Sequence, residues 1–112
     1  MPSDTMPHHK LLGYQLALEL VQLIGRIRIA DAKFREQARK SAASAALNAA
    51  EGAARFSRAD KSRAFAIAAA EACEAVAAVE IATALGSCSE ADKAEVLKLG
   101  LSVKNVLSRL VQ

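Results

Sequence analysis

The side chains able to perform acid–base or metal chemistry are few in this sequence, and they do not form a recognisable site. His8 and His9 are the two histidines, and they follow Pro7 in a segment that we expect to be mobile. Glu71 and Glu74 can share one helical face, but the Glu-x-x-His pattern of di-iron bundles is missing. The five glycines are isolated, so there is no glycine-rich phosphate loop. We therefore expect no enzyme activity, no metal site and no cofactor, and interpret the two glutamates as partners for bases of a neighbouring helix or subunit.

The cysteines and the apolar segments also argue against a secreted or membrane protein. Cys73 and Cys88 form no C-x-x-C pair and would lie roughly 20 Å apart along a helical chain, too far for a disulfide. We expect Cys73, on an alanine-rich face, to be a small buried residue. The most apolar window, residues 64–86, contains three glutamates, and each would cost about 2.5–3.5 kcal/mol at a bilayer centre. Residues 1–9 lack a signal-peptide core, so a cytoplasmic location is expected.

The composition identifies the elements that must position any functional residues. The 112 residues and 11.8 kDa allow one domain, and an apolar content of 53% is enough to bury a core. The chain has 26 alanines and 13 leucines but only 4% aromatic residues. Because alanine and leucine are the strongest helix formers, this composition nearly excludes all-β and α/β folds. We predict a flexible tail over residues 1–9 and an all-α domain over residues 10–112.

Hydrophobic periodicity predicts four helices, over about residues 10–30, 31–55, 57–85 and 89–112. Asp31 is a plausible N-cap, and Ser57 and Ser89 each begin a Ser-x-x-Asp variant of the capping box. Gly86 is expected to end the third helix in a left-handed conformation. Short connections favour antiparallel neighbours, so the predicted architecture is an up-down-up-down four-helix bundle.

The first helix carries more apolar surface than one partner helix needs. Two neighbouring stripes follow its length, one of Leu12, Leu16, Leu20, Leu23 and Ile27 and the other of Ala17, Val21 and Ile24. The second and third helices are crowded with alanine, whose small side chain lets helix axes approach closely. We interpret these two helices as a tight seam inside the bundle or between subunits, and the surplus apolar surface as a driving force for oligomerisation.

The second helix has a regular polar stripe, spaced alternately by four and three residues along one face: Gln37, Ser41, Ser44, Asn48, Glu51 and Arg55. One interpretation is a solvated face. The other is a polar seam towards another helix or subunit, in which Asn48 and Glu51 fix the register. Because serine and asparagine are poor helix formers on a solvated face, the composition favours the seam.

The run from Gln37 to Gly52 resembles the signature of the four-helix bundle proteins encoded in 23S rRNA intervening sequences. The matching motif positions are Gln37, Ser44, Asn48, Glu51 and Gly52, supported by Glu74 in the third helix and by Tyr14-Gln-Leu-Ala17 in the first. Ala46 stands where the family often has proline, and Glu71 where it usually has a hydroxyl residue. The resemblance implies a bundle similar to the accessory protein of diversity-generating retroelements, which is a barrel-like homopentamer that binds nucleic acid and a reverse transcriptase.

The positive charge is unevenly distributed along the chain. The net charge is +3, but residues 26–63 carry +6 and the remainder −3. An up-and-down fold mixes both signs at one end of the bundle. At the other end it gathers seven bases with only two acids nearby, Glu51 and Asp60, so the charge of that end is about +5. The seven bases are Lys10, Arg55, Arg58, Lys61, Arg63, Lys104 and Arg109.

These features favour a non-enzymatic, oligomeric bundle that binds the backbone of RNA or DNA through this basic end. A ring of subunits, by the resemblance a homopentamer, would combine the basic ends into one rim. Phe56 is the only aromatic residue in that part of the sequence, so backbone contacts are expected rather than base stacking. The alternatives are a solvated basic cluster without a partner, or a scaffold module that docks on a reverse transcriptase or ribosomal component.

Overall fold

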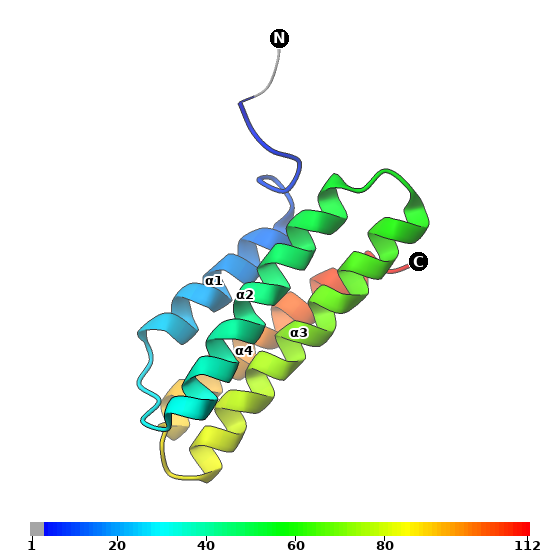
Figure 1. Ribbon diagram of the computed structural model, residues 1–112. Helices are drawn as coiled ribbons and strands as arrows, with labels where there is room; N and C mark the ends of the chain where they lie inside the picture. Colours follow the sequence, from blue (N-terminus) through cyan, green and yellow to red (C-terminus); the bar gives the residue numbers. More distant parts are fainter. Residues whose placement is uncertain (1–3) are drawn as a thin grey trace.

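The computed structural model describes residues 4–112 and confirms the all-α class, with four helices and no strand over that range (Figure 1). The helices are α1 (Leu12–Arg26), α2 (Ala32–Ala54), α3 (Arg58–Ala84) and α4 (Glu90–Ser108). Each helix packs against its neighbours in the chain, and α4 also packs against α1. No helix over residues 4–112 is both long enough and apolar enough to cross a membrane.

The connections between the helices lie at two ends of the molecule. Figure 1 shows the α1–α2 and α3–α4 connections together at one end and the α2–α3 connection at the other. Ala30 N–H donates to the Ser87 carbonyl at 2.9 Å, which joins the first two connections. At the other end, called here the α2–α3 end, Gln112 N–H donates to Ser62 Oγ at 2.8 Å and fixes the C-terminus beside α3.

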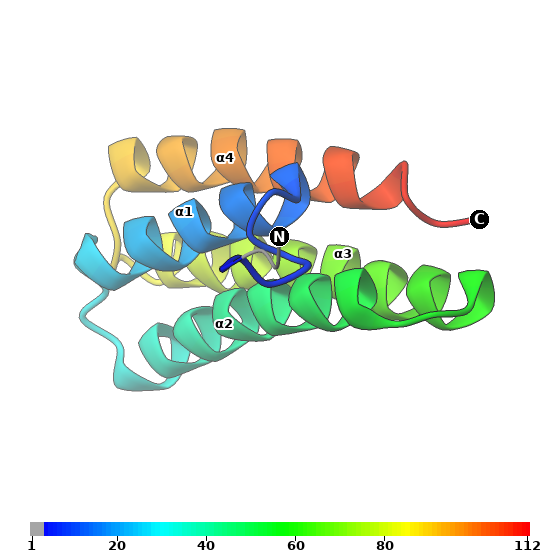
Figure 2. The same cartoon turned by 90° about the horizontal axis from the view of Figure 1, so that it is seen from above.

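The helices differ in length, and this difference leaves the α2–α3 end sparsely covered. With 15 residues α1 is about 22 Å long, whereas the 27 residues of α3 extend over about 40 Å. Figure 2 shows α2 and α3 extending well past the start of α1, next to the C-terminal segment. The side chains of the α2–α3 connection therefore project into solvent.

The predicted helix ends are confirmed where side chains cap them. Asp31 accepts a hydrogen bond from Phe34 N–H, and Ser57 and Ser89 accept one each from the amide three residues later, all at 3.1 Å. Each bond satisfies an amide that the first turn of a helix leaves unpaired. Gly86 follows α3 with a φ of 78°, the predicted left-handed conformation.

The first helix is shorter than predicted at both ends. It stops at Arg26 instead of Ala30, because the chain becomes extended at Ile27, with ψ 156°. Ile27 and Ile29 are both buried, and the residues between and after them are exposed, so this segment buries apolar side chains with the alternation of a strand. At the other end Leu12 is exposed, and the neighbouring Gly13 is buried against Leu107.

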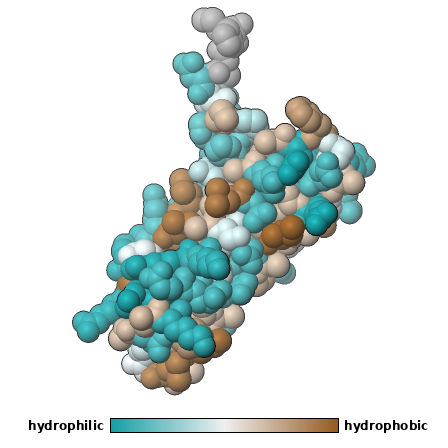
Figure 3. Space-filling view, viewed as in Figure 1, coloured by the Kyte–Doolittle hydropathy of each residue, from teal (hydrophilic) through white to brown (hydrophobic). Residues whose placement is uncertain are grey.

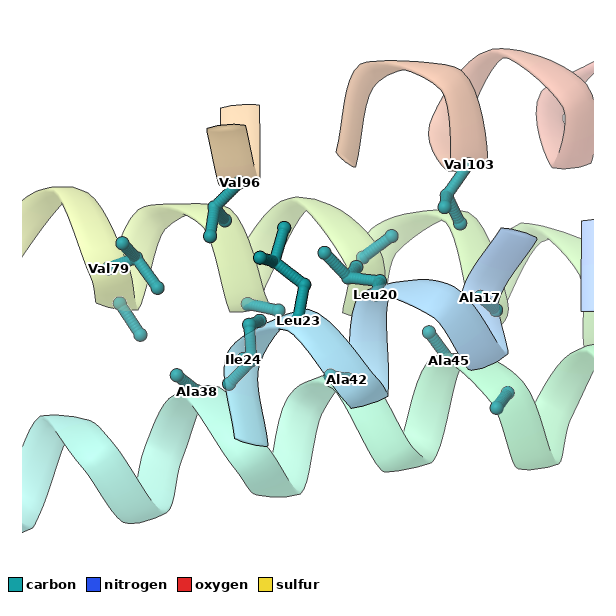
Figure 4. Close-up of a cluster of buried hydrophobic side chains, with 14 of the residues drawn as sticks. Ala17, Leu20, Leu23, Ile24, Ala38, Ala42, Ala45, Val79, Val96 and Val103 are labelled. Carbon is teal, nitrogen blue, oxygen red and sulfur yellow. The ribbon is translucent and has the colours of Figure 1, made fainter. Parts of the chain in front are cut away.

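The core is built from a few large side chains and many alanines (Figure 4). Leu20, Ile24, Val79, Val103 and Leu107 are among the largest fully buried side chains. The alanine-rich α2 and α3 pack against each other inside the chain, and eight of their alanines are fully buried: Ala38, Ala42, Ala45, Ala49, Ala68, Ala72, Ala75 and Ala82. The small side chains let these two long helices lie close together.

The prediction for Cys73 is wrong, and the predicted N-terminal tail is only partly covered by the described residues. Cys73 is exposed rather than buried, because it lies on the outer face of α3, and both it and the half-buried Cys88 are free thiols. Residues 1–3 of the predicted tail lie outside the described residues. Of the rest, His9 accepts a hydrogen bond from Met6 N–H through Nδ1 and one from Gln15 Nε2 through its carbonyl.

Candidate nucleic-acid interface

Three of the predicted basic residues surround one open hollow at the α2–α3 end. Arg58 and Lys61 belong to the first turn of α3, and Arg109 ends α4. They line a hollow of about 410 Å³ together with Phe56, Phe65, Leu110 and Gln112. No acidic residue lines it. The hydrogen bonds between Ser62 and Gln112 hold the C-terminal segment next to α3 and so keep Arg109 beside the other two bases.

The three bases differ in how free their charged groups are. Lys61 Nζ donates to the carbonyls of Gly52 and Ala53 at 3.2 and 3.1 Å, so it caps the last turn of α2, where the helix dipole favours a cation. The guanidinium groups of Arg58 and Arg109 make no hydrogen bond or ion pair with residues 4–112. The two guanidinium groups are therefore available to a ligand, while Lys61 adds charge and holds the helix ends together.

Arg55 and Arg63 lie in a second hollow, on the outer side of the α2–α3 pair. Arg55 forms an ion pair of 2.7 Å with Glu51, one turn earlier in α2. Asp60, Arg63 and Ile67 complete the lining with Ala64. Two bases face two acids here, so the local charge is balanced. Five of the seven predicted bases are thus divided between a hollow whose charged side chains are all basic and a groove in which the charges balance.

The remaining predicted bases lie outside both hollows. Lys104 lines an apolar depression between α3 and α4 with Cys73, Val76, Leu97 and others. Lys10 is exposed ahead of α1. Neither side chain is brought to the basic hollow, although both belong to the same half of the molecule.

At the opposite end of the molecule the two signs of charge lie side by side. Arg28 and Asp92 line one hollow, and Arg26 shares another with Glu19 and Glu95. Lys93 forms an ion pair of 2.8 Å with Glu90, and this contact raises the pKa of the lysine. The unbalanced positive charge is therefore at the α2–α3 end.

The first half of the polar stripe is a seam between helices. Gln37 Nε2 donates to Ser41 Oγ at 3.0 Å and to Glu74 Oε1 of α3 at 3.1 Å. Ser41 is fully buried, and its hydroxyl is satisfied by this contact. For these residues the prediction of a polar seam is correct.

The second half of the stripe does not link helices of one chain. Asn48 Nδ2 donates to the Ser44 carbonyl at 2.9 Å and to its Oγ at 3.2 Å, within α2. Glu51 pairs with Arg55 of the same helix. Asn48 and Glu51 therefore link no two helices of this chain, because these polar contacts stay within α2, and a role for them in the register with another subunit stays a prediction.

Gly52 has a packing role that the sequence analysis did not assign. A Cβ atom at this position would lie 2.6 Å from Cε1 of Phe65, and the three nearest atoms all belong to that ring. Phe65 is buried, so moving its ring would disturb the packing around it. The glycine lets α2 approach the aromatic ring of α3 next to the basic hollow. A glycine inside a helical pattern was the available signal.

Glu71 and Glu74 are paired with each other rather than with a base. A side-chain hydrogen bond with Glu71 and the like charge of that carboxylate raise the pKa of Glu74 above its usual value, while Lys40 acts weakly in the opposite direction. Both ion pairs over residues 4–112 involve other acids. The expected pairing with bases of a neighbouring helix is thus not found within the chain.

Together these features define a small all-α protein with four helices, a tightly packed α2–α3 seam and a basic end. Within that class, the family model for 23S rRNA-intervening sequence proteins matches residues 9–109. The chain belongs to this family. A comparison with curated proteins returns no match.

Proposed function

We propose that the protein is a non-enzymatic, oligomeric, antiparallel up-down-up-down four-helix bundle that binds the sugar–phosphate backbone of RNA or DNA through its α2–α3 end, in the cytoplasm. The observation that carries this proposal is the hollow that Arg58, Lys61 and Arg109 line and that no acidic residue lines. Two of the three cations have no partner in the described chain, as a surface for an external anion requires.

Phosphate contacts explain why such a surface suits a polyanion. Arginine binds phosphate oxygens through two parallel N–H groups, and each neutralised phosphate releases counterions from the nucleic acid. One subunit offers few such contacts. An oligomer that brings several α2–α3 ends to one rim multiplies them, and the field at the rim rises accordingly.

Exposed apolar side chains support the oligomer. Leu47 is 71% exposed, Ile67 42% and Leu101 50%, each on an outer helix face. Figure 3 shows hydrophobic surface in several patches on the face that it presents, separated by polar groups. Burying such side chains between copies would stabilise an assembly by about 25 cal/mol per Å² of apolar surface. We propose a homopentamer, in line with the resemblance described above.

The test is a binding titration with labelled RNA at several salt concentrations. The variant Arg58→Glu/Arg109→Glu removes the two free guanidinium groups. Arg26→Glu/Arg28→Glu is the matched control, because it changes the net charge equally at the other end of the molecule. We expect the first variant to bind weakly, with a salt dependence reduced by about two counterions for each subunit that contacts the RNA, and the control to bind like the wild type.

Equal losses in both variants would show that only net charge matters, and no binding by the wild type at low salt would refute the proposal. The alternative is a scaffold that docks on a protein, such as a reverse transcriptase or ribosomal component. The neutral groove of Glu51, Arg55, Asp60 and Arg63, with Ile67 exposed beside it, favours that alternative. A partner that stays bound after nuclease treatment, with no binding of RNA alone, would establish it.

A further inference from the structure

Phe56 is the most exposed large apolar side chain of the described residues. It lies in the three-residue connection between α2 and α3, and its side chain is fully accessible to solvent. Figure 3 shows a hydrophobic projection at this connection, with polar surface next to it. An aromatic ring in this position adds nothing to the core, and exposing it to water is unfavourable. Its position suggests a ligand that covers the ring.

The backbone on both sides of Phe56 is held in place. Arg55 N–H donates to the Glu51 carbonyl and closes the last turn of α2. Ser57 caps α3 by accepting from Asp60 N–H, and Lys61 Nζ ties the start of α3 to the end of α2. The connection is thus anchored at each end, so little conformational freedom is lost when the ring is covered.

The surroundings of the ring indicate the chemistry of that ligand. Phe56 lines the same hollow as Arg58, Lys61 and Arg109, and Phe65 forms part of its wall, so the prediction that Phe56 is the only aromatic residue at the basic end is wrong. A flat apolar surface therefore lies beside cations that no acid neutralises. A nucleotide is complementary to this pair of features, because its base has a π-face and its phosphate is an anion.

We infer that an unpaired nucleobase stacks on Phe56 while the adjoining phosphates contact Arg58 and Arg109. The inference rests on the proposed function and deepens it, since it specifies a single-stranded segment, a loop or an unpaired end as the ligand. Inside a regular duplex both faces of each base are already stacked on neighbouring bases, so these bases cannot cover the ring. The ring therefore makes the protein bind unpaired segments more tightly than duplexes, whereas the cations alone would bind both equally well.

The experiment compares an oligoadenylate RNA of about 12 nucleotides with a duplex of the same length. Phe56→Ala should weaken binding of the single strand by about five-fold to a hundred-fold and leave duplex binding within about two-fold. Leu85→Ala is the matched control, because Leu85 is also an exposed apolar residue after a helix end, at the opposite end of the molecule. Leu85→Ala should change neither the affinity for the single strand nor the affinity for the duplex.

Fluorescence gives a second readout. The chain has no tryptophan, so Phe56→Trp places a single indole at the proposed stacking position. Its emission should be quenched by the single strand and much less by the duplex. Phe56→Leu, which keeps apolar area without an aromatic face, should behave like Phe56→Ala.

Several outcomes would overturn the inference. Equal effects of Phe56→Ala on both RNAs, or no effect on either, would mean that the ring contacts no base. A loss of binding to anionic phosphatidylserine vesicles with unchanged RNA binding would assign the ring to a lipid surface, and a lowered native mass would assign it to a subunit contact. If the wild type binds both RNAs, these results leave the proposed function standing. If it binds neither, both fail.

Discussion

Gly52→Ala is the substitution that most sharply tests the packing beside the basic hollow. The added Cβ would lie 2.6, 2.8 and 3.0 Å from three atoms of the Phe65 ring. Ordinary contact begins at 3.4 Å, so the ring would have to withdraw by about 0.8 Å. Phe65 is buried, so α2 and α3 must separate or the ring must leave its preferred rotamer.

Two opposing effects determine how much Gly52→Ala changes the free energy of unfolding. Overpacking of a core costs about 1–3 kcal/mol, and we place this site in the upper part of that range because all the close atoms belong to one buried ring. Replacing glycine by alanine inside a helix contributes about 1 kcal/mol in the other direction. The free energy of unfolding should therefore fall by about 1–2 kcal/mol, and Tm by about 4–8 °C for each kcal/mol.

Thermal and urea unfolding followed by circular dichroism measure the change. Gly25→Ala is the matched control: Gly25 is also helical, but nothing lies within 4 Å of an added Cβ. The Gly25→Ala variant should have a free energy of unfolding higher than that of the wild type by up to about 1 kcal/mol. In a Phe65→Leu background the penalty of Gly52→Ala should shrink, because the smaller side chain can move aside. If Gly52→Ala is as stable as Gly25→Ala, the close approach of α2 to Phe65 is refuted.

Three further outcomes are expected. Asp31→Ala should lower the free energy of unfolding by about 1 kcal/mol in urea, because it removes the cap that accepts from Phe34 N–H; an unchanged midpoint would contradict the cap. Glu71→Gln should lower the pKa of Glu74 in a carbon-detected NMR titration. The raised pKa means that the folded chain binds this proton more tightly than the unfolded chain, so the wild type loses stability as the pH rises between the two pKa values, and the variant should lose less. Cys73 should react with a thiol reagent faster than Cys88 in the native protein, and equal rates would contradict its exposed position.

Much of the fold follows from local chemistry that the sequence displays. Helix propensity, the hydrophobic period and the Asp31, Ser57, Ser89 and Gly86 signals depend on residues a few positions apart. These signals predicted four helices and their best-defined ends correctly. The early end of α1 was not predicted, because both a helix and an extended segment can bury Ile27, and only tertiary packing decides between them.

The candidate site was predicted in part. The chain order of the helices brings Arg58, Lys61 and Arg109 to one end, as charge counting suggested. Which base is neutralised depends on contacts that sequence spacing does not determine. Two such contacts are the ion pair between Arg55 and Glu51 and the hydrogen bonds that Lys61 donates to carbonyls of α2.

The contacts whose partners were not predicted join residues on different helices. The bridge from Gln37 to Glu74 spans 37 positions, and the Gly52–Phe65 contact depends on the register of α2 against α3. The exposure of Phe56 arises because α1 is too short to cover that end. Composition and periodicity report the face on which a residue lies, but not the neighbour that it meets there.

The native mass of the protein, measured by light scattering after size-exclusion chromatography, tests the claim on which the rest depends, that copies of this bundle assemble and combine their basic ends. For a homopentamer of 11.8 kDa chains the account predicts about 59 kDa at micromolar concentration. A constant mass of 11.8 kDa over the whole concentration range would contradict it, because a single chain then carries its exposed apolar side chains and the basic hollow at its α2–α3 end alone.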